Sequence, residues 1–125
     1  MKCNVQEQEG RIRPDGTEKV TGALKYLTDL SFPNMLYGKV LRSPHPHAKI
    51  LSINTEKAEQ LAGVKAVLTY KNVPGLNRFG IVFPDQPVLC GERVRYVGDA
   101  VAAVAAETIE IAQQALKYIE VEYEL

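Results

Sequence analysis

The sequence predicts an α+β fold in which a mixed, partly antiparallel sheet packs with two main helices. Segments with the period-two alternation of strands interleave with segments that have the 3.6-residue period of helices. The links "SPHPHA" at 43–48 and "VGDA" at 97–100 join strand-like segments, and both are too short for the crossover that parallel strands require. Strands must therefore run antiparallel at these places, which separates the chain from doubly wound folds.

The front of the chain is polar and opens with a turn. Residues 1–10 form a polar leader, and a single domain is predicted over residues 11–125. The motif "RPDG" at 13–16 has the composition of a tight reversal. Apolar and polar residues then alternate over 36–43 and over 47–54, so both segments are predicted strands.

A short helix and a third strand follow these two strands. Asn54 and Thr55 offer an N-cap for the helix "TEKAEQLA" at 55–62, and Gly63 supplies its C-terminal stop. The apolar face of this helix is formed by Ala58, Leu61 and Ala62. The segment "VKAVLT" at 64–69 is rich in β-branched residues and is a predicted strand.

The next stretch passes from a loop to the predicted centre of the sheet. Three prolines and three glycines within 71–93 exclude a long helix and predict an ordered surface loop. A strand over 93–98 places Val94 and Tyr96 on the face opposite its arginines. The run "AVAAVAAE" at 100–107 consists mainly of small apolar residues, which is typical of a central strand buried on both faces.

The chain finishes with a helix and a strand whose patterns are distinct. Thr108 can cap the helix, which has five apolar residues at helical spacing: Ile111, Ala112, Ala115, Leu116 and Ile119. The period then becomes two, with an apolar set of Val121, Tyr123 and Leu125 and an acidic set of Glu120, Glu122 and Glu124. We interpret the glutamates as a solvated face and not as paired catalytic carboxylates.

Both histidines of the chain, His45 and His47, lie in the link "SPHPHA". In extended backbone they project to the same face, so two imidazoles could chelate one ion. Zinc sites need three or four protein ligands, however, and the sequence has no further histidine. A histidine base would need an oriented partner, and Ser43 is only a neighbour in sequence. We therefore interpret the segment, with Pro44 and Pro46, as a stiff turn.

The remaining candidate groups also have structural interpretations. Cys3 and Cys90 have no Cys-x-x-Cys spacing and no local partner set, so both are predicted free thiols. Asp99, in the "VGDA" link, is expected to bond its own backbone. Three arginines could meet acidic groups of a partner or belong to solvated strand faces: Arg42, Arg93 and Arg95. The residues alone predict no catalytic, cofactor-binding or metal site.

Composition and charge exclude several classes of function. Fifteen basic residues offset fifteen acidic ones, so there is no basic field to hold nucleic acid or an anionic membrane surface. No apolar run approaches the roughly 20 residues that span a bilayer. The N-terminus "MKCNVQEQEG" lacks the apolar core of a secretory signal. A cytoplasmic protein without a disulfide is expected.

Five segments, taken in order, resemble one known family. They are "DGTEKVTGALKYLTDL" at 15–30, "LYGKVLRSPHPHAKILSIN" at 36–54, "LAGVKAVLTYKNVPG" at 61–75, "PVLCGERVRYVGDAVAAVAAET" at 87–108 and "AQQALKYIEVEYEL" at 112–125. Together they are similar to the α/β-hammerhead domain of the molybdenum-binding subunit of xanthine dehydrogenases and aldehyde oxidases. The resemblance covers about residues 11–125, and "RSPHPHAKI" and "VRYVGDAVAAVAAE" carry most of it.

The resemblance implies an oxidoreductase. In that family a molybdenum centre on molybdopterin hydroxylates aldehydes or N-heterocycles such as purines with oxygen from water, and electrons leave through [2Fe-2S] clusters to FAD. The family's catalytic glutamate and cofactor loops lie in larger domains after the hammerhead, and its cluster-binding cysteines lie in another domain or subunit. No family site residue maps onto this chain. The implied role is docking to the molybdopterin-binding domains and to the iron–sulfur and flavin domains or subunits.

Three hypotheses follow for the chain as it stands. The first is a hammerhead fragment of a molybdenum hydroxylase, cut from a longer polypeptide and catalytically silent alone. The second is a free-standing interaction module with the same fold, and the third is a small metal-dependent protein that uses the two histidines. The fragment hypothesis also predicts an exposed apolar patch and some self-association in solution.

Overall fold

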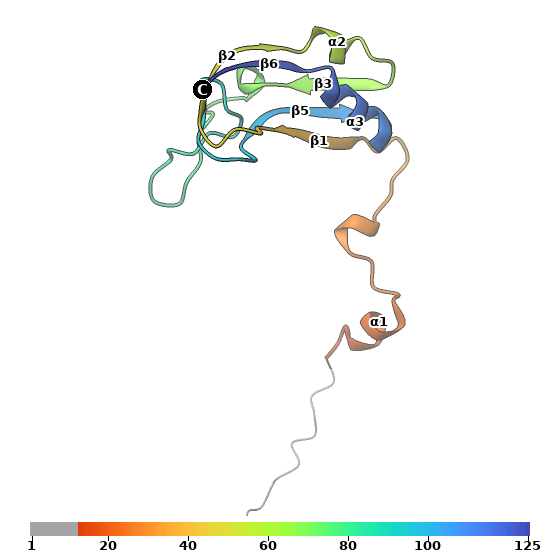
Figure 1. Cartoon of the computed structure of the whole chain (residues 1–125). Helices are drawn as coiled ribbons and strands as arrows, with labels where there is room; N and C mark the ends of the chain where they lie inside the picture. Colours follow the sequence, from red (N-terminus) through yellow and green to blue (C-terminus); the bar gives the residue numbers. More distant parts are fainter. Residues whose placement is uncertain (1–12) are drawn as a thin grey trace, which may run out of the picture. The chain divides into compact units, whose positions relative to one another are not determined.

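The protein is described by a computed structural model that covers residues 13–125 (Figure 1). The chain divides into two compact units, Met1–Pro33 and Asn34–Leu125. The predicted leader 1–10 and Cys3 lie outside the described residues. The predicted domain boundary after the leader therefore remains a prediction.

The first unit contains one short helix and one 3-10 turn. The backbone N–H of Gly16 donates to the carbonyl oxygen of Arg13 at 2.9 Å, so the turn predicted at "RPDG" is confirmed. This turn leads directly into α1 (Gly16–Thr21), which the sequence patterns did not indicate because the helix buries no apolar face. Gly22 ends α1 with a φ of 73°, which glycine adopts without strain. A single 3-10 turn, η1 (Leu27–Asp29), follows.

The second unit is built on two three-stranded antiparallel sheets. The first sheet has the order β1-β5-β3, and the second has the order β4-β2-β6. The strands are β1 (Tyr37–Arg42), β5 (Ala100–Ala106) and β3 (Val64–Leu68) in the first sheet, and β4 (Arg93–Val94), β2 (Ala48–Asn54) and β6 (Glu120–Glu124) in the second. The α+β class is confirmed, but the described strands pair only antiparallel, so the expectation of a mixed sheet is wrong. Short links carry the chain between the two sheets. No two strands that pair within a sheet are parallel, so none needs a crossover connection.

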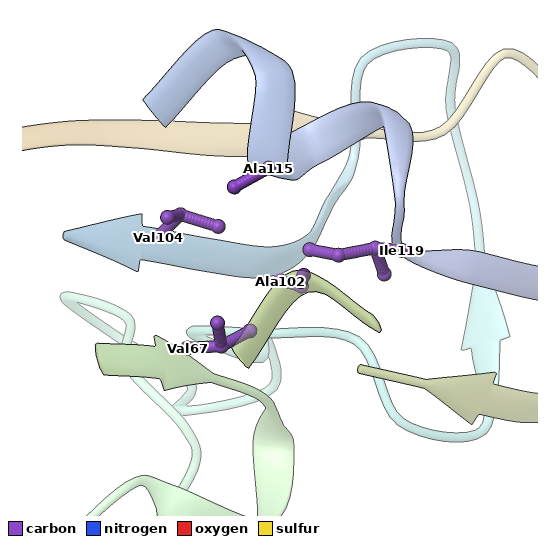
Figure 2. Packing of buried hydrophobic residues seen from close by; sticks show 6 residues of the cluster. Val67, Ala102, Val104, Ala115 and Ile119 are labelled. Atoms are coloured by element: carbon purple, nitrogen blue, oxygen red, sulfur yellow. The ribbon is translucent and has the colours of Figure 1, made fainter. Parts of the chain in front are cut away.

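The central strand β5 carries the main core, as the run of small apolar residues predicts. The last helix, α3 (Ile109–Lys117), lies against β1 and β5 with its predicted apolar stripe inward. Figure 2 shows the packed side chains of this core, which are Val67, Ala102, Val104, Ala115 and Ile119. Small side chains on β5 and α3 let the helix approach the sheet closely, which favours dense packing.

The helix α2 (Glu56–Glu59) is shorter than the sequence predicts. Asn54 caps it, because the side-chain oxygen of Asn54 accepts the first backbone N–H of the helix at 3.0 Å. Ala58 is buried as predicted, but Ala62 is exposed, since the chain has already left the helix and turns at Gly63 with a φ of 89°. In the part of the chain that the structure describes, no helix is long and apolar enough to cross a membrane.

The strand predicted over 93–98 ends after Val94. The backbone N–H of Asp99 donates to the carbonyl oxygen of Tyr96 at 3.2 Å, which closes a turn instead of extending the strand. Gly98 has a φ of 96° within this turn. Tyr96 is consequently 48% exposed, and its predicted place on a buried strand face is wrong.

The strand β6 shows the predicted alternation of half-buried and exposed residues. Its glutamates face solvent and meet polar groups of neighbouring elements: Glu120 pairs with Lys57 at 2.5 Å, Glu122 accepts from the hydroxyl of Ser52 at 2.9 Å, and Glu124 lies 3.7 Å from Lys49. The solvated acidic face is therefore confirmed. Leu125 is 88% exposed because the pairing of β6 with β2 ends at Glu124, so the expectation that Leu125 faces the core is wrong.

Candidate functional site

The two short links singled out in the sequence lie against each other. Ser43 is buried, and its hydroxyl accepts the backbone N–H of His45 at 3.0 Å and donates to the carbonyl oxygen of the same residue at 3.1 Å. The backbone N–H of Ser43 donates to the carbonyl oxygen of Asp99 at 2.9 Å, and that of Gly98 donates to the carbonyl of Ser43 at 2.8 Å. Arg42 adds a side-chain bond to the Gly98 carbonyl at 2.8 Å. The links "SPHPHA" and "VGDA" thus form one bonded corner.

The two histidines in this corner have different surroundings. The half-buried ring of His45 meets the ring of Tyr123 edge to face, with centroids 4.9 Å apart and an interplanar angle of 68°. His47 is exposed. Among residues 13–125, no group of three or more His, Cys, Asp or Glu side chains is placed to hold a metal ion. The aromatic contact shows that His45 packs against Tyr123, which agrees with the interpretation of this segment as a structural turn.

Buried groups behind the corner have no catalytic arrangement. Cys90 is buried, and this burial, together with the Asp99 carboxylate, raises the pKa of its thiol to about 12. Asp99 is itself buried, and its carboxylate accepts the backbone N–H of Arg95 at 3.0 Å, so the side chain bonds nearby backbone four residues earlier in place of the predicted bond to its own backbone. Burial also raises the pKa of the Tyr123 phenol. A thiol that stays protonated near neutral pH is a poor nucleophile and a poor metal ligand.

The available donors do not fit the cofactors that the resemblance implies. A [2Fe-2S] cluster needs four ligands, usually thiolates, whereas the whole sequence has two cysteines, of which Cys90 is held as a neutral thiol. The sequence also lacks the glycine-rich motifs that cradle phosphates of nucleotide cofactors. No chemical step through molybdenum, iron–sulfur or flavin can therefore be built on the described residues.

Three surface grooves of about 370, 410 and 690 Å³ share Tyr70 and Gly91. Five basic residues line two of these grooves: His47, Lys49, Arg78, Arg93 and Arg95. Asp85 and Glu92 also line these grooves, so their walls carry charges of both signs. An active-site pocket is usually concave and mainly apolar with a few convergent polar groups, and these open, mixed-charge grooves do not have that character.

The most conspicuous exposed feature is an apolar arm, which we define as residues 77–89. It extends from the sheets as a loop (Figure 1). Ile81, Val82 and Phe83 form its tip, because they lie between the bridged residues Phe79 and Gln86. Ile81 is fully exposed, and the other two are 77% and 74% exposed. Three consecutive apolar residues between Gly80 and Pro84 are the sequence signal for this tip, which the prediction of a surface loop over 71–93 did not use.

The apolar arm is an ordered loop. At its base, the Asn77 side chain donates to the carbonyl oxygen of Leu89 at 2.7 Å and accepts the backbone N–H groups of Val88 and Leu89 at 3.0 and 3.1 Å. Farther out, the backbones of Phe79 and Gln86 exchange two hydrogen bonds of 2.8 and 3.2 Å. The tip is therefore presented to solvent on a fixed stem.

The described residues form an α+β domain of two antiparallel three-stranded sheets, with a helix over the central strand and a bonded corner between two links. Residues 21–125 match the family model described as "Aldehyde oxidase and xanthine dehydrogenase, a/b hammerhead domain". The chain belongs to this family, and the resemblance found in the sequence is confirmed.

Named relatives support this membership. The chain is 73% identical over 119 residues to a probable xanthine dehydrogenase subunit of Bacillus subtilis, a match of 95% of this chain and 16% of that protein. It is 48% identical over 116 residues to the nicotinate dehydrogenase large molybdopterin subunit of Eubacterium barkeri, covering 93% of this chain and 27% of that one. The chain thus spans between about one-sixth and one-quarter of these relatives.

Solved structures confirm the hammerhead fold. The aldehyde oxidoreductase from Desulfovibrio gigas superimposes with a TM-score of 0.83 at 36% identity, over 90% of this chain and 14% of that one. The CO dehydrogenase from Oligotropha carboxidovorans gives a TM-score of 0.84 at 37% identity, over 92% and 15% of the two chains. In each case the match is one segment of a much longer polypeptide.

Proposed function

We propose that this chain is the hammerhead segment of a molybdenum hydroxylase that acts on aldehydes or on N-heterocycles such as purines. In this proposal the segment docks the other parts of the enzyme and performs no catalysis alone. The observation that carries the docking role is the apolar arm, whose tip keeps three large apolar side chains in water on an ordered stem. Exposed apolar patches of this kind mark interaction sites.

The identity of the complete enzyme rests on the relatives. Their names describe a probable xanthine dehydrogenase subunit, a nicotinate dehydrogenase large molybdopterin subunit and an aldehyde oxidoreductase. In the proposal, molybdopterin, the [2Fe-2S] clusters and FAD are held by other domains or subunits, because the donors in this chain do not suit them. These domains and subunits are also the docking partners. In this proposal the enzyme works in the cytoplasm, where thiols such as the free Cys90 stay reduced.

A second candidate is a free-standing interaction module that has the hammerhead fold without the enzyme. The apolar arm supports this candidate as well, because it would serve any partner with a complementary groove. The coding sequence downstream discriminates between the two. A continuous reading frame or an adjacent gene for the larger molybdenum domains favours the enzyme.

The docking role can be tested by exchanging segments within a complete subunit. This chain replaces the matching segment of the Bacillus subtilis relative, which is 73% identical, and the exchanged subunit is produced with its natural partners. Ile81→Glu and Phe83→Glu are then compared with Leu51→Glu, which changes an exposed apolar residue of β2 outside the arm. We expect the arm variants to lower the yield of assembled enzyme and its xanthine-hydroxylating activity, whereas Leu51→Glu retains both. Full assembly with both arm variants would contradict the role of the arm.

A further inference from the structure

The first sheet has one covered face, which is mainly apolar, and one open face. The covered face is the one that packs against α3 in the core. On the opposite face, strand register aligns two rows of side chains across β1, β5 and β3. One row is Gly38, Ala105 and Ala66, and the other is Val40, Ala103 and Leu68. We call these six residues the open face.

The open face carries no charged or polar side chain. Val40 is 39% exposed and Leu68 is 44% exposed, and Gly38 and Ala66 are also exposed. A solvated sheet face normally alternates with polar residues, whereas a strand that is apolar on both faces is typical of a sheet buried on both sides. The sequence of β5 therefore predicts a second covering layer, which residues 34–125 of the second unit do not supply over these two rows.

The pairing of β5 with β1 is interrupted at one end of this face. Leu41 pairs with Ala102 and Arg42 pairs with Ala100, so Val101 lies in a bulge. Val101 is fully buried and packs in a cluster with Cys90 and Val94. Residues of this chain therefore cover β5 at the bulge, whereas the two rows of the open face lie in the regular part of the strand.

We propose that the remainder of the molybdenum-binding large subunit covers the open face. This inference rests on the proposed function and adds the open face as a second docking surface, separate from the apolar arm. The Bacillus subtilis relative supplies the occupant, since this chain matches only 16% of its length and most of that polypeptide lies outside the match. Because the face lacks charge, the covering segment must itself be apolar. Four of the six residues have no side chain beyond Cβ, so the segment can approach the strands closely, between the larger Val40 and Leu68.

Cysteine protection tests this proposal in the exchanged Bacillus subtilis subunit. Val40→Cys and Leu68→Cys are introduced singly, with Leu51→Cys as the control on an exposed strand position of the second sheet. Each cysteine is alkylated with iodoacetamide, in the isolated 125-residue chain at low concentration and in the assembled enzyme. Peptide-level mass spectrometry reports the rate at each position, so alkylation of other cysteines does not interfere.

We expect alkylation at positions 40 and 68 to be slower by about tenfold or more in the assembled enzyme than in the isolated chain, with no such change at position 51. Unchanged rates at 40 and 68 in an enzyme that assembles and hydroxylates xanthine would overturn this inference and leave the proposed function intact. Failure of the exchanged subunit to assemble would instead count against the proposed function. Protection already present in the dilute isolated chain would show that the chain covers the face itself and would also overturn the proposal.

Substituting the face gives an independent measurement. Val40→Thr keeps the side-chain volume and suits a strand, so it tests polarity with little risk to folding. We expect the isolated Val40→Thr chain to unfold at an unchanged urea midpoint, and the assembled enzyme carrying it to dissociate more readily. Equal dissociation of both enzymes would contradict a buried position for Val40.

Discussion

The ring of Tyr70 lies against the Cα of Gly91, so closely that a Cβ at position 91 would overlap the ring. Tyr70 is the first residue of the 3-10 turn η2 (Tyr70–Asn72), and Gly91 lies just before β4. The contact joins two segments about twenty residues apart and forms the common wall of the three surface grooves. Position 91 therefore requires glycine because the Tyr70 ring lies so close to its Cα, and not because the backbone there is left-handed.

Gly91→Ala should destabilise the domain. The added methyl must displace the Tyr70 ring, and overpacking of this kind costs about 1–3 kcal/mol. Urea unfolding followed by circular dichroism measures the change in the free energy of unfolding. Gly38→Ala is the matched control, since a Cβ at position 38 has no atom within 4 Å and alanine suits a strand better than glycine. Equal free energies of unfolding for Gly91→Ala and Gly38→Ala would show that the Tyr70 ring can move aside without cost, and would contradict the prediction.

Asn77→Ala should loosen the apolar arm. It removes three hydrogen bonds to the backbone of Val88 and Leu89. Leu89 is buried, and buried backbone groups left without partners cost about 1–3 kcal/mol. We expect faster amide hydrogen exchange at Val88 and Leu89, with the exchange in β5 unchanged. Asn77→Asp keeps the acceptor and loses the donor, so its effect should be intermediate. Exchange rates in Asn77→Ala that match the wild type would show that the Asn77 hydrogen bonds do not hold the base of the arm.

The buried thiol of Cys90 should make the domain less stable in alkaline solution. Its pKa is raised from 9.0 to about 12, so the folded state favours the neutral form. The corresponding stability is fully present below pH 9 and is lost as the pH rises from 9 towards 12, with a limiting slope of about 1.4 kcal/mol per pH unit. Between pH 9 and 10, Cys90→Ser should show a flatter dependence of unfolding free energy on pH. This window limits the contribution of Tyr123, whose raised pKa acts in the same direction at higher pH.

Thr108 should contribute to stability as the N-cap of α3. Its hydroxyl accepts the backbone N–H of Ile111 at 3.3 Å, and replacing such a cap by alanine typically costs about 1 kcal/mol. Thr108→Ser retains the hydroxyl and should remain close to the wild type in thermal unfolding. Thr55→Ala is the contrasting variant, because Thr55 bonds the side chain of Glu59 and caps no backbone group. A larger loss at position 55 than at position 108 would be the reverse of the expected order.

Local periodicity was enough to predict the elements that pack against each other. The spacing of apolar residues located α3, and the run of small residues located β5 as the central strand. The extent of β4 and the exposure of Tyr96 were missed because they depend on the turn closed by Asp99, and "VRYVG" reads equally well as a strand. The two-sheet arrangement also depends on which strands pair at long range, which no local pattern contains.

Local patterns also failed to predict the contacts that build the corner and the apolar arm. Sequence patterns singled out the links "SPHPHA" and "VGDA" separately, but the bond between Ser43 and Asp99 joins residues far apart in the chain and is visible only in the structure. Asn77 was missed because a surface asparagine in a loop has many ordinary roles. The open face was indicated indirectly, since the pattern of β5 predicts burial on both sides and the chain covers one side completely.

In the proposed function, this chain is a scaffold segment of a molybdenum enzyme and holds no cofactor itself. The molybdenum content of purified protein from molybdate-fed cells tests it most directly, with the isolated 125-residue chain compared with the exchanged Bacillus subtilis subunit in its assembled enzyme. We expect stoichiometric molybdenum in the assembled enzyme and none above background in the isolated chain. Stoichiometric molybdenum bound to the isolated chain, or an assembled enzyme without molybdenum, would contradict the claim.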